Sequence, residues 1–251
     1  MATDSFRNTP AGTAVAALPG RRYDHVFFPA IAALMLVTVF IGFGPTYYLA
    51  GVFRAPLPSL TIHLHAVAFS CWILLLVVQT SLAAAGRVGL HRRLGVAGVV
   101  LAAAMVVLGV LAATDSLVRG AGPPGRDAKF FYIVPLSSIF MFGVLMVFAW
   151  RERSNSTAHK RLILVATTAL LVAAIARWPI AAISRKILID TWLSFLFLLF
   201  LVLYDLWSLR KVHRATLWAG VFLVGVSQLR FVVGRTDAWH SFAGWVQELA
   251  R

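Results

Sequence analysis

The sequence predicts an all-α fold, a polytopic membrane protein built as a seven-transmembrane-helix bundle. Hydrophobic residues make up 60% of its 251 positions and charged residues only 13%, which is unlike an ordinary soluble domain. Seven apolar runs each reach the ~20 residues that a helix needs to cross a bilayer. They cover roughly residues 26–50, 60–84, 94–114, 130–150, 162–184, 191–208 and 215–233.

A transmembrane β-barrel is excluded by the pattern within these runs. Barrel strands alternate apolar and polar residues over ~10 positions, whereas Trp72–Val78 and Leu193–Leu203 are continuously apolar. Backbone groups in lipid must be satisfied within the segment, so the seven spans are expected to be helices. Lipid is therefore the first partner that we expect.

The net charge of +14 does not indicate nucleic acid, because the basic residues sit at the ends of spans. The segment before span 1 and the second, fourth and sixth loops carry most of them. The positive-inside rule then predicts a cytoplasmic N-terminus and an external C-terminus, N-in/C-out.

Three regions are expected along the chain. Residues 1–24 form a polar cytoplasmic tail, residues 25–234 the transmembrane domain, and residues 235–251 an external amphipathic tail with Trp239, Phe242 and Trp245 on its apolar side. Cys71 is the only cysteine, so one chain forms no disulfide, Fe–S cluster or thiolate zinc site.

Local signals mark several span ends. Ser59 is a predicted N-cap for span 2, and Gly42, Gly44 and Pro45 predict a bend near the outer end of span 1. Residues 115–129 are expected to form an external loop, and His91 to lie in a basic turn before span 3.

Spans 3, 5 and 7 each begin at a histidine followed by a basic residue: His91-Arg92-Arg93, His159-Lys160-Arg161 and His213-Arg214. Either one hairpin unit is used three times after a leading helix, or the likeness is coincidental.

Charged residues within the outer half of the spans need an explanation, because each costs at least ~2.5–3.5 kcal/mol to insert. Helix geometry puts Arg177 and Arg230 at about the depth of His65. Together with His63, and with Asp190 at the rim, they would line one outward-facing polar pocket for an anionic group. Alternatively, Arg177 snorkels to the interface and pairs with Asp190.

The pair His63 and His65 is a candidate ligand set for a metal or a cofactor. Residues two apart on a helix point ~200° apart, so the two side chains chelate one ion only if the first turn is unwound. The alternative is one interior and one interfacial histidine.

Histidines form a second group at the predicted cytoplasmic ends, where His91, His159 and His213 begin odd-numbered spans and His25 lies at the same level. Neutral imidazoles from different helices suit bis-histidine haem ligation or a transition-metal site. The alternative is an interfacial basic cap. No zinc-protease, serine-hydrolase or nucleotide-binding motif occurs in a sequence context where it could function.

Residues 63–95 (HLHAVAFSCWILLLVVQTSLAAAGRVGLHRRLG) and 159–179 (HKRLILVATTALLVAAIARWP) resemble a family of uncharacterised multi-pass membrane proteins of proteobacteria. The histidine-arginine helix start is also similar to small families linked to cytochrome oxidase assembly and, more distantly, to b561-type cytochromes. The latter resemblance implies haem held between histidines of neighbouring helices. His63 or His65 would then serve an outer site, and His91 and His159 an inner one.

Three functions follow as hypotheses for a protein of the bacterial inner membrane. The first is a redox or assembly protein that binds haem b or copper through His63, His65, His91 and His159, with Arg177 placing an anionic group. The second is a transporter or channel for a small or anionic solute, with Arg177 and Arg230 on the pathway. The third is a non-catalytic subunit of a membrane complex, whether with other subunits or as a homo-oligomer.

Overall fold

The computed structural model describes residues 23–56, 58–122, 127–180 and 186–251. Every regular element in these ranges is helical, which confirms the all-α prediction. The elements are α1 (Asp24–Phe43), a π-helical turn η2 (Gly44–Tyr48), α2 (Ala50–Phe53), α3 (Leu60–Ala84), α4 (Val88–Val118), α5 (Ala128–Arg151), α6 (Ser156–Thr168), α7 (Val172–Ile175), α8 (Ile187–Leu209), α9 (Arg214–Val233) and α10 (Asp237–Leu249).

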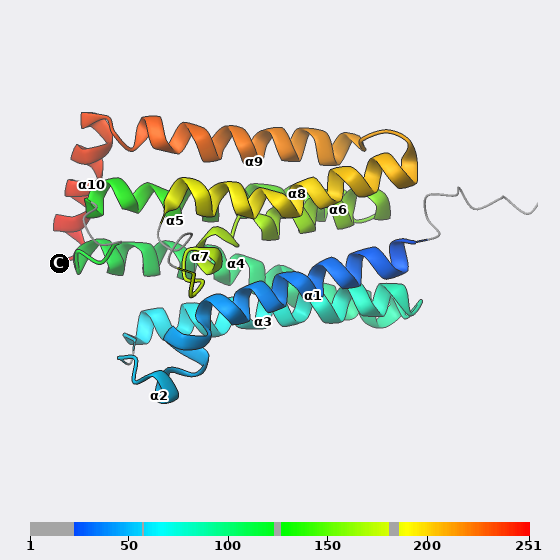
Figure 1. Cartoon of the computed structure of the whole chain (residues 1–251), viewed down its shortest axis with the longest axis horizontal. Helices are drawn as coiled ribbons and strands as arrows, with labels where there is room; N and C mark the ends of the chain where they lie inside the picture. The colour runs from blue at the N-terminus through cyan, green and yellow to red at the C-terminus, as the bar shows by residue number, and fades with distance from the viewer. Residues whose placement is uncertain (1–22, 57, 123–126, 181–185) are drawn as a thin grey trace, which may run out of the picture.

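Seven helical segments in the described residues are long and apolar enough to cross a membrane, as predicted. They run side by side, and α1 begins at the end of the bundle opposite to α10 (Figure 1). Large apolar side chains face outward along these helices, among them Val100, Val221 and Val232, each about two-thirds exposed. Because lipid tails can cover such side chains, the chain is a multi-pass integral membrane protein.

The fifth span is shorter than the predicted range of 162–184. It begins at Ser156, breaks after Thr168 and ends with the single turn of α7 at Ile175. Pro179 explains why the helix ends here, since the residue before a proline disfavours helical geometry. The predicted residues 181–184 lie outside the described ranges.

The third span is longer than predicted at both ends. It begins at Val88, so His91, Arg92 and Arg93 lie within the first turns of α4 rather than in a preceding turn. At the other end α4 continues through Val118, into residues predicted to be loop. The tight connection from α3 depends on Gly86, whose φ of +70° favours glycine.

The local structure agrees with the bend predicted near the end of span 1 and with the N-cap predicted at Ser59. Gly44 and Pro45 open the π-helical turn that ends the first span, and the Ser59 side chain accepts a hydrogen bond from the amide of Ile62 at 3.4 Å. Gly42 touches α7: a Cβ placed on it would lie 2.1 Å from the carbonyl oxygen of Ala174. α1 and α7 therefore pack backbone to backbone.

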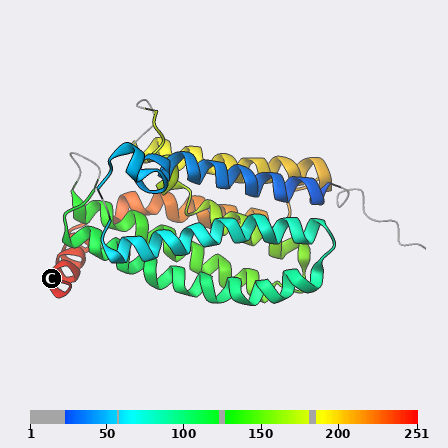
Figure 2. The ribbon, with the colours of Figure 1, turned by 90° about the horizontal axis from the view of Figure 1, so that it is seen from below.

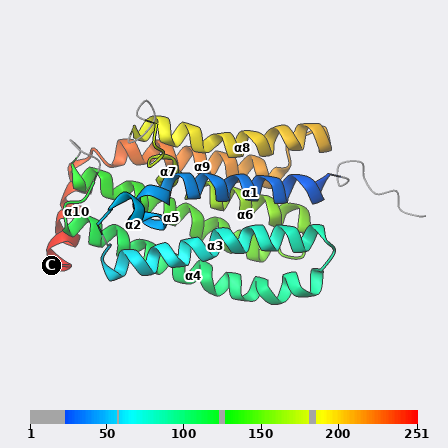
Figure 3. The same ribbon diagram turned by 60° about the horizontal axis from the view of Figure 1, so that its bottom comes forward.

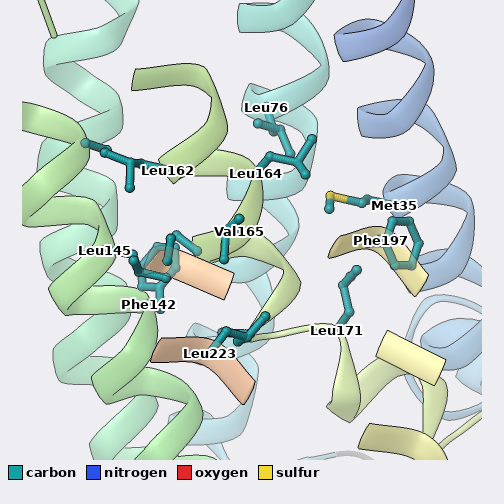
Figure 4. Packing of buried hydrophobic residues seen from close by; sticks show 14 of the residues in the cluster. Met35, Leu76, Phe142, Leu145, Leu162, Leu164, Val165, Leu171, Phe197 and Leu223 are labelled. Atoms are coloured by element: carbon teal, nitrogen blue, oxygen red, sulfur yellow. The ribbon is translucent and has the colours of Figure 1, made fainter. Parts of the chain in front are cut away.

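The core is centred on α6, the most deeply buried of the spans. Leu162 and Val165 of this helix meet Phe142 and Leu145 of α5, with Leu223 of α9 nearby (Figure 4). A buried polar link joins α6 to α3, where the Trp72 indole donates to the Thr167 hydroxyl at 3.2 Å. This bond fixes the C-terminal end of α6 against α3.

α8 lies along one edge of the bundle and α4 along another, as two further views show (Figures 2 and 3). α10 crosses the end of the bundle and is tied to it by two hydrogen bonds. The Trp239 indole donates to the Lys129 carbonyl at 2.8 Å, and the Gln247 amide to the Leu117 carbonyl at 3.1 Å. Trp239 thus packs on α5, while Phe242 and Trp245 stay exposed.

Candidate functional site

His91 of α4 and His159 of α6 lie together at the basic end of the bundle, with ring centroids 6.5 Å apart and ring planes nearly perpendicular, at 87°. Each imidazole is oriented by a backbone carbonyl of the preceding helix. His91 Nδ1 lies 3.3 Å from the Gln79 oxygen, and His159 Nδ1 lies 2.7 Å from the Ala149 oxygen. Two helix pairs therefore hold their histidines in the same way.

The carbonyl contacts determine the tautomer of both rings. A carbonyl oxygen only accepts, so Nδ1 carries the proton in each histidine, and Nε2 of the neutral ring is a lone-pair donor. This arrangement, with one ring nitrogen bound to a carbonyl and the other available, is typical of metal-ligating histidines. The pair can therefore supply two nitrogen ligands from different helices.

His213 does not repeat this arrangement. Its Nδ1 accepts a hydrogen bond from the Ala215 amide at 3.1 Å and so caps α9. Burial, followed by the charge of Arg161, lowers the pKa of His213. The proposed threefold hairpin repeat thus has two members with matching geometry and a third with a different one.

The segments that carry the histidine pair are rich in basic residues. The exposed residues Arg92 and Arg93 follow His91 on α4, and Arg151 and Arg153 end the preceding hairpin. His159 is followed directly by Lys160, which is ion-paired to Asp24 of α1. The excess of positive charge at this end suits an anionic group better than a bare cation.

A buried ion pair that the sequence did not predict joins three helices at this end of the bundle. Arg161, only 1% exposed, donates from Nε at 2.9 Å and from Nη2 at 2.5 Å to Asp205 of α8. The other oxygen of Asp205 accepts from the Thr216 hydroxyl at 2.6 Å and from the His213 amide at 3.0 Å. The pair joins α6, α8 and α9, and its signal in the sequence was one aspartate near the inner end of an apolar span.

A second charged contact lies next to it. Asp24 accepts from the Tyr204 hydroxyl at 2.7 Å in addition to its ion pair with Lys160. Tyr204 stacks on Phe27 with ring centroids 3.9 Å apart. These contacts tie α1, α6 and α8 together at the basic end, so Lys160 and Arg161 are structural partners of acidic residues rather than a solvated cap.

The outer histidines lie apart. Both belong to the regular helix α3, whose geometry points them in different directions. His63 is exposed and its Nδ1 lies 3.0 Å from the Tyr47 hydroxyl, whereas the ring of His65 packs on Phe69 at 4.0 Å. The condition for joint chelation, an unwound first turn, is not met, so His63 and His65 do not form one metal site.

The residues expected to line an outer pocket are also divided. Arg177 is exposed, donates to the Ala173 carbonyl at 2.7 Å and lies over the Phe43 ring. Arg230 is instead buried between α9 and α8, where it donates to Thr191 at 2.6 Å. Asp190 is buried on α8, next to Thr191. Arg177 and Arg230 thus contact different partners, on α1 and α8 respectively.

Among the described residues, no group of three or more His, Cys, Asp or Glu side chains is placed to hold a metal ion. Comparison with protein-family models, with curated proteins and with solved structures gives no match.

Proposed function

We propose that this membrane protein binds haem b between His91 and His159 and acts in redox chemistry or in cofactor assembly. The observation that carries the proposal is the pairing of the two rings at 6.5 Å with both Nδ1 atoms held by carbonyls. Two imidazoles on one ion, with metal–nitrogen bonds of about 2.0–2.1 Å, hold their ring centres roughly 6 Å apart. The spacing of the two rings fits this requirement.

The surrounding charge favours haem over a free metal ion. Haem carries two propionates, and Arg92, Arg93 and Arg151 supply cations that can bind carboxylates. When bound, haem supplies one-electron exchange. His91 and His159 would hold the iron, the Gln79 and Ala149 carbonyls would fix the imidazole tautomers, and the arginines would neutralise the propionates.

Copper is the second candidate cofactor, because imidazole also suits copper and two ligands already stand together. The resemblance to proteobacterial membrane families supports a place in the bacterial inner membrane. The proposed function is compatible with a single chain, with a homo-oligomer and with a complex that contains other membrane subunits.

The test compares matched histidine variants purified in mild detergent from haem-replete cells. Asparagine places its NH2 group about where Nδ1 lies, so it can still donate to the Gln79 or Ala149 carbonyl but is a poor haem ligand. His91→Asn and His159→Asn therefore change ligation with little change in packing. Both variants should lose most of the haem that the wild-type protein retains.

His63→Asn is the control, because His63 lies at the opposite end of the bundle and is exposed. It should retain the wild-type haem content. Equal haem in all four proteins, or a wild-type protein free of haem and of copper, would refute the proposal. Copper without haem, lost in the same two variants, would select copper as the cofactor.

A further inference from the structure

Two arginines are buried within the bundle, and they differ in how their charge is compensated. Arg161 is paired with Asp205 and also donates from Nη1 to the Thr157 carbonyl at 2.9 Å. Arg230 is just as deeply buried, at 2% exposed, yet no carboxylate of the described residues forms an ion pair with it, not even that of Asp190, which is buried beside Thr191. The charge of Arg161 is thus compensated by a carboxylate within the bundle, whereas the charge of Arg230 is not.

The hydrogen bonds of Arg230 are incomplete. Nη2 donates to the Thr191 hydroxyl at 2.6 Å, whereas Nε and Nη1 are buried and meet no acceptor among the described residues. Arginine remains protonated under all ordinary conditions, so the charge cannot be removed by titration. A buried charged group with unmet hydrogen bonds is strongly destabilising, which indicates that an acceptor is missing.

Arg230 lies near buried hydroxyl groups, with Asp190 beside Thr191 on α8, and its guanidinium carbon lies 5.0 Å from the centroid of the Phe231 ring. Thr191 and Ser194 of α8, and Ser227 one turn before Arg230 on α9, are all at most 1% exposed. Ile133, Val134, Ile187 and Phe231 form a buried apolar cluster at the same end. Water is therefore largely excluded around a fixed positive charge and a few polar groups, an environment that strengthens electrostatic attraction.

We propose that Arg230 is the centre of a binding site for one small monovalent anion, between α8 and α9 near the end of the bundle that carries α10. The two unmet guanidinium nitrogens supply the hydrogen bonds, and Thr191 fixes the guanidinium. A single negative charge neutralises the arginine, whereas a divalent anion would leave a net charge in a poorly solvated place. The site is independent of the histidine pair and of haem.

The test is thermal unfolding of the detergent-purified full chain at constant ionic strength. Sodium gluconate, whose anion is bulky, is the reference, and chloride, nitrate, formate or acetate replaces it. At least one small anion should raise the midpoint saturably, by roughly 5–10 °C at about 100 times its dissociation constant. Comparing halide with carboxylates shows which anion class the site prefers. Identical midpoints in all five salts would overturn the proposal.

Two variants assign the effect to a residue. Arg230→Gln removes the charge and should abolish the dependence on the anion. Arg177→Gln removes an exposed arginine and should preserve it. An anion effect that survives in Arg230→Gln, or that is lost only in Arg177→Gln, would contradict the proposed site. If Arg230→Gln does not fold, Arg230→Lys provides a second test. Lysine keeps the charge but lacks the planar guanidinium, so this variant should bind the preferred anion at least tenfold more weakly than the wild-type protein.

Discussion

Arg161 and Asp205 form a buried ion pair that connects α6 to α8, with side chains 1% and 0% exposed. Removing one partner of such a pair leaves an uncompensated charge and typically costs about 3–5 kcal/mol. We therefore expect Asp205→Ala to lower the free energy of unfolding by that amount, measured by denaturant titration in detergent.

Asp115→Ala is the matched control, because Asp115 pairs with Arg119 at 2.6 Å on the surface, with side chains 26% and 49% exposed. Exposed pairs contribute about 0–1 kcal/mol. Replacing both buried partners by apolar residues, as in Arg161→Met with Asp205→Leu, should recover much of the loss. Equal costs for the two aspartate variants would contradict a structural role for the buried pair.

Gly42 allows α1 to approach α7. In Gly42→Ala the new Cβ would overlap the backbone of Ala174, which cannot rotate away, so the helices must separate. We expect a loss of about 1–3 kcal/mol, the usual cost of overpacking, in the free energy of unfolding. Gly44→Ala, two residues on, meets nothing within 4 Å and should be close to neutral. Two equally stable variants would show that α1 and α7 do not touch here.

Acid should destabilise the basic end of the bundle through His213. Its pKa is lowered first by burial, then by Arg161, with Asp205 opposing and Lys160 and Lys211 adding smaller effects. Because the folded state binds the proton less well than the unfolded state, stability is full above the ordinary histidine pKa, about 6.5, and falls as pH drops below it. Protonation also removes the acceptor that caps α9 at Ala215.

His213→Asn isolates this effect, since asparagine is also a good N-cap residue but does not titrate. Between roughly pH 7.5 and pH 5 its unfolding midpoint should fall less than that of the wild-type protein. Parallel pH profiles for the two proteins would exclude His213 as a contributor.

The N-in/C-out orientation remains a prediction from the basic residues. Seven spans place the two ends of the chain on opposite sides. A C-terminal alkaline phosphatase fusion, active only outside the cytoplasm, should be active in bacterial cells, and a C-terminal green fluorescent protein fusion should be dark. The reverse pair of results would mean that the basic loops face outward.

The number of spans was predictable because each apolar run exceeds the length that a bilayer demands. Where a span ends was harder to predict. Span 5 was extended to residue 184 because Ala181, Ala182 and Ile183 continue its hydrophobicity, whereas the structure ends the helix at Ile175, before Pro179. Hydropathy measures composition, and the break after Thr168 depends on local backbone geometry that composition does not encode.

The polar sites were predictable only in part. Depth along a helix placed Arg177, Arg230 and His65 at one level, but the direction of each side chain around its helix depends on packing. Arg177 consequently lies by Phe43, while Arg230 lies by Thr191. His91 and His159 were singled out as ligand candidates, but their proximity depends on how α4 packs near α6. The partner of Arg161 lies 44 residues away in the sequence, and no local pattern indicates it.

The visible absorption spectrum of the purified wild-type protein, oxidised and then reduced with dithionite, tests the central claim most directly. Haem held between His91 and His159 should give a Soret band and sharp α and β bands on reduction, as six-coordinate iron does. A featureless spectrum, from protein expressed in haem-replete cells and free of metal by elemental analysis, would contradict a cofactor at the histidine pair.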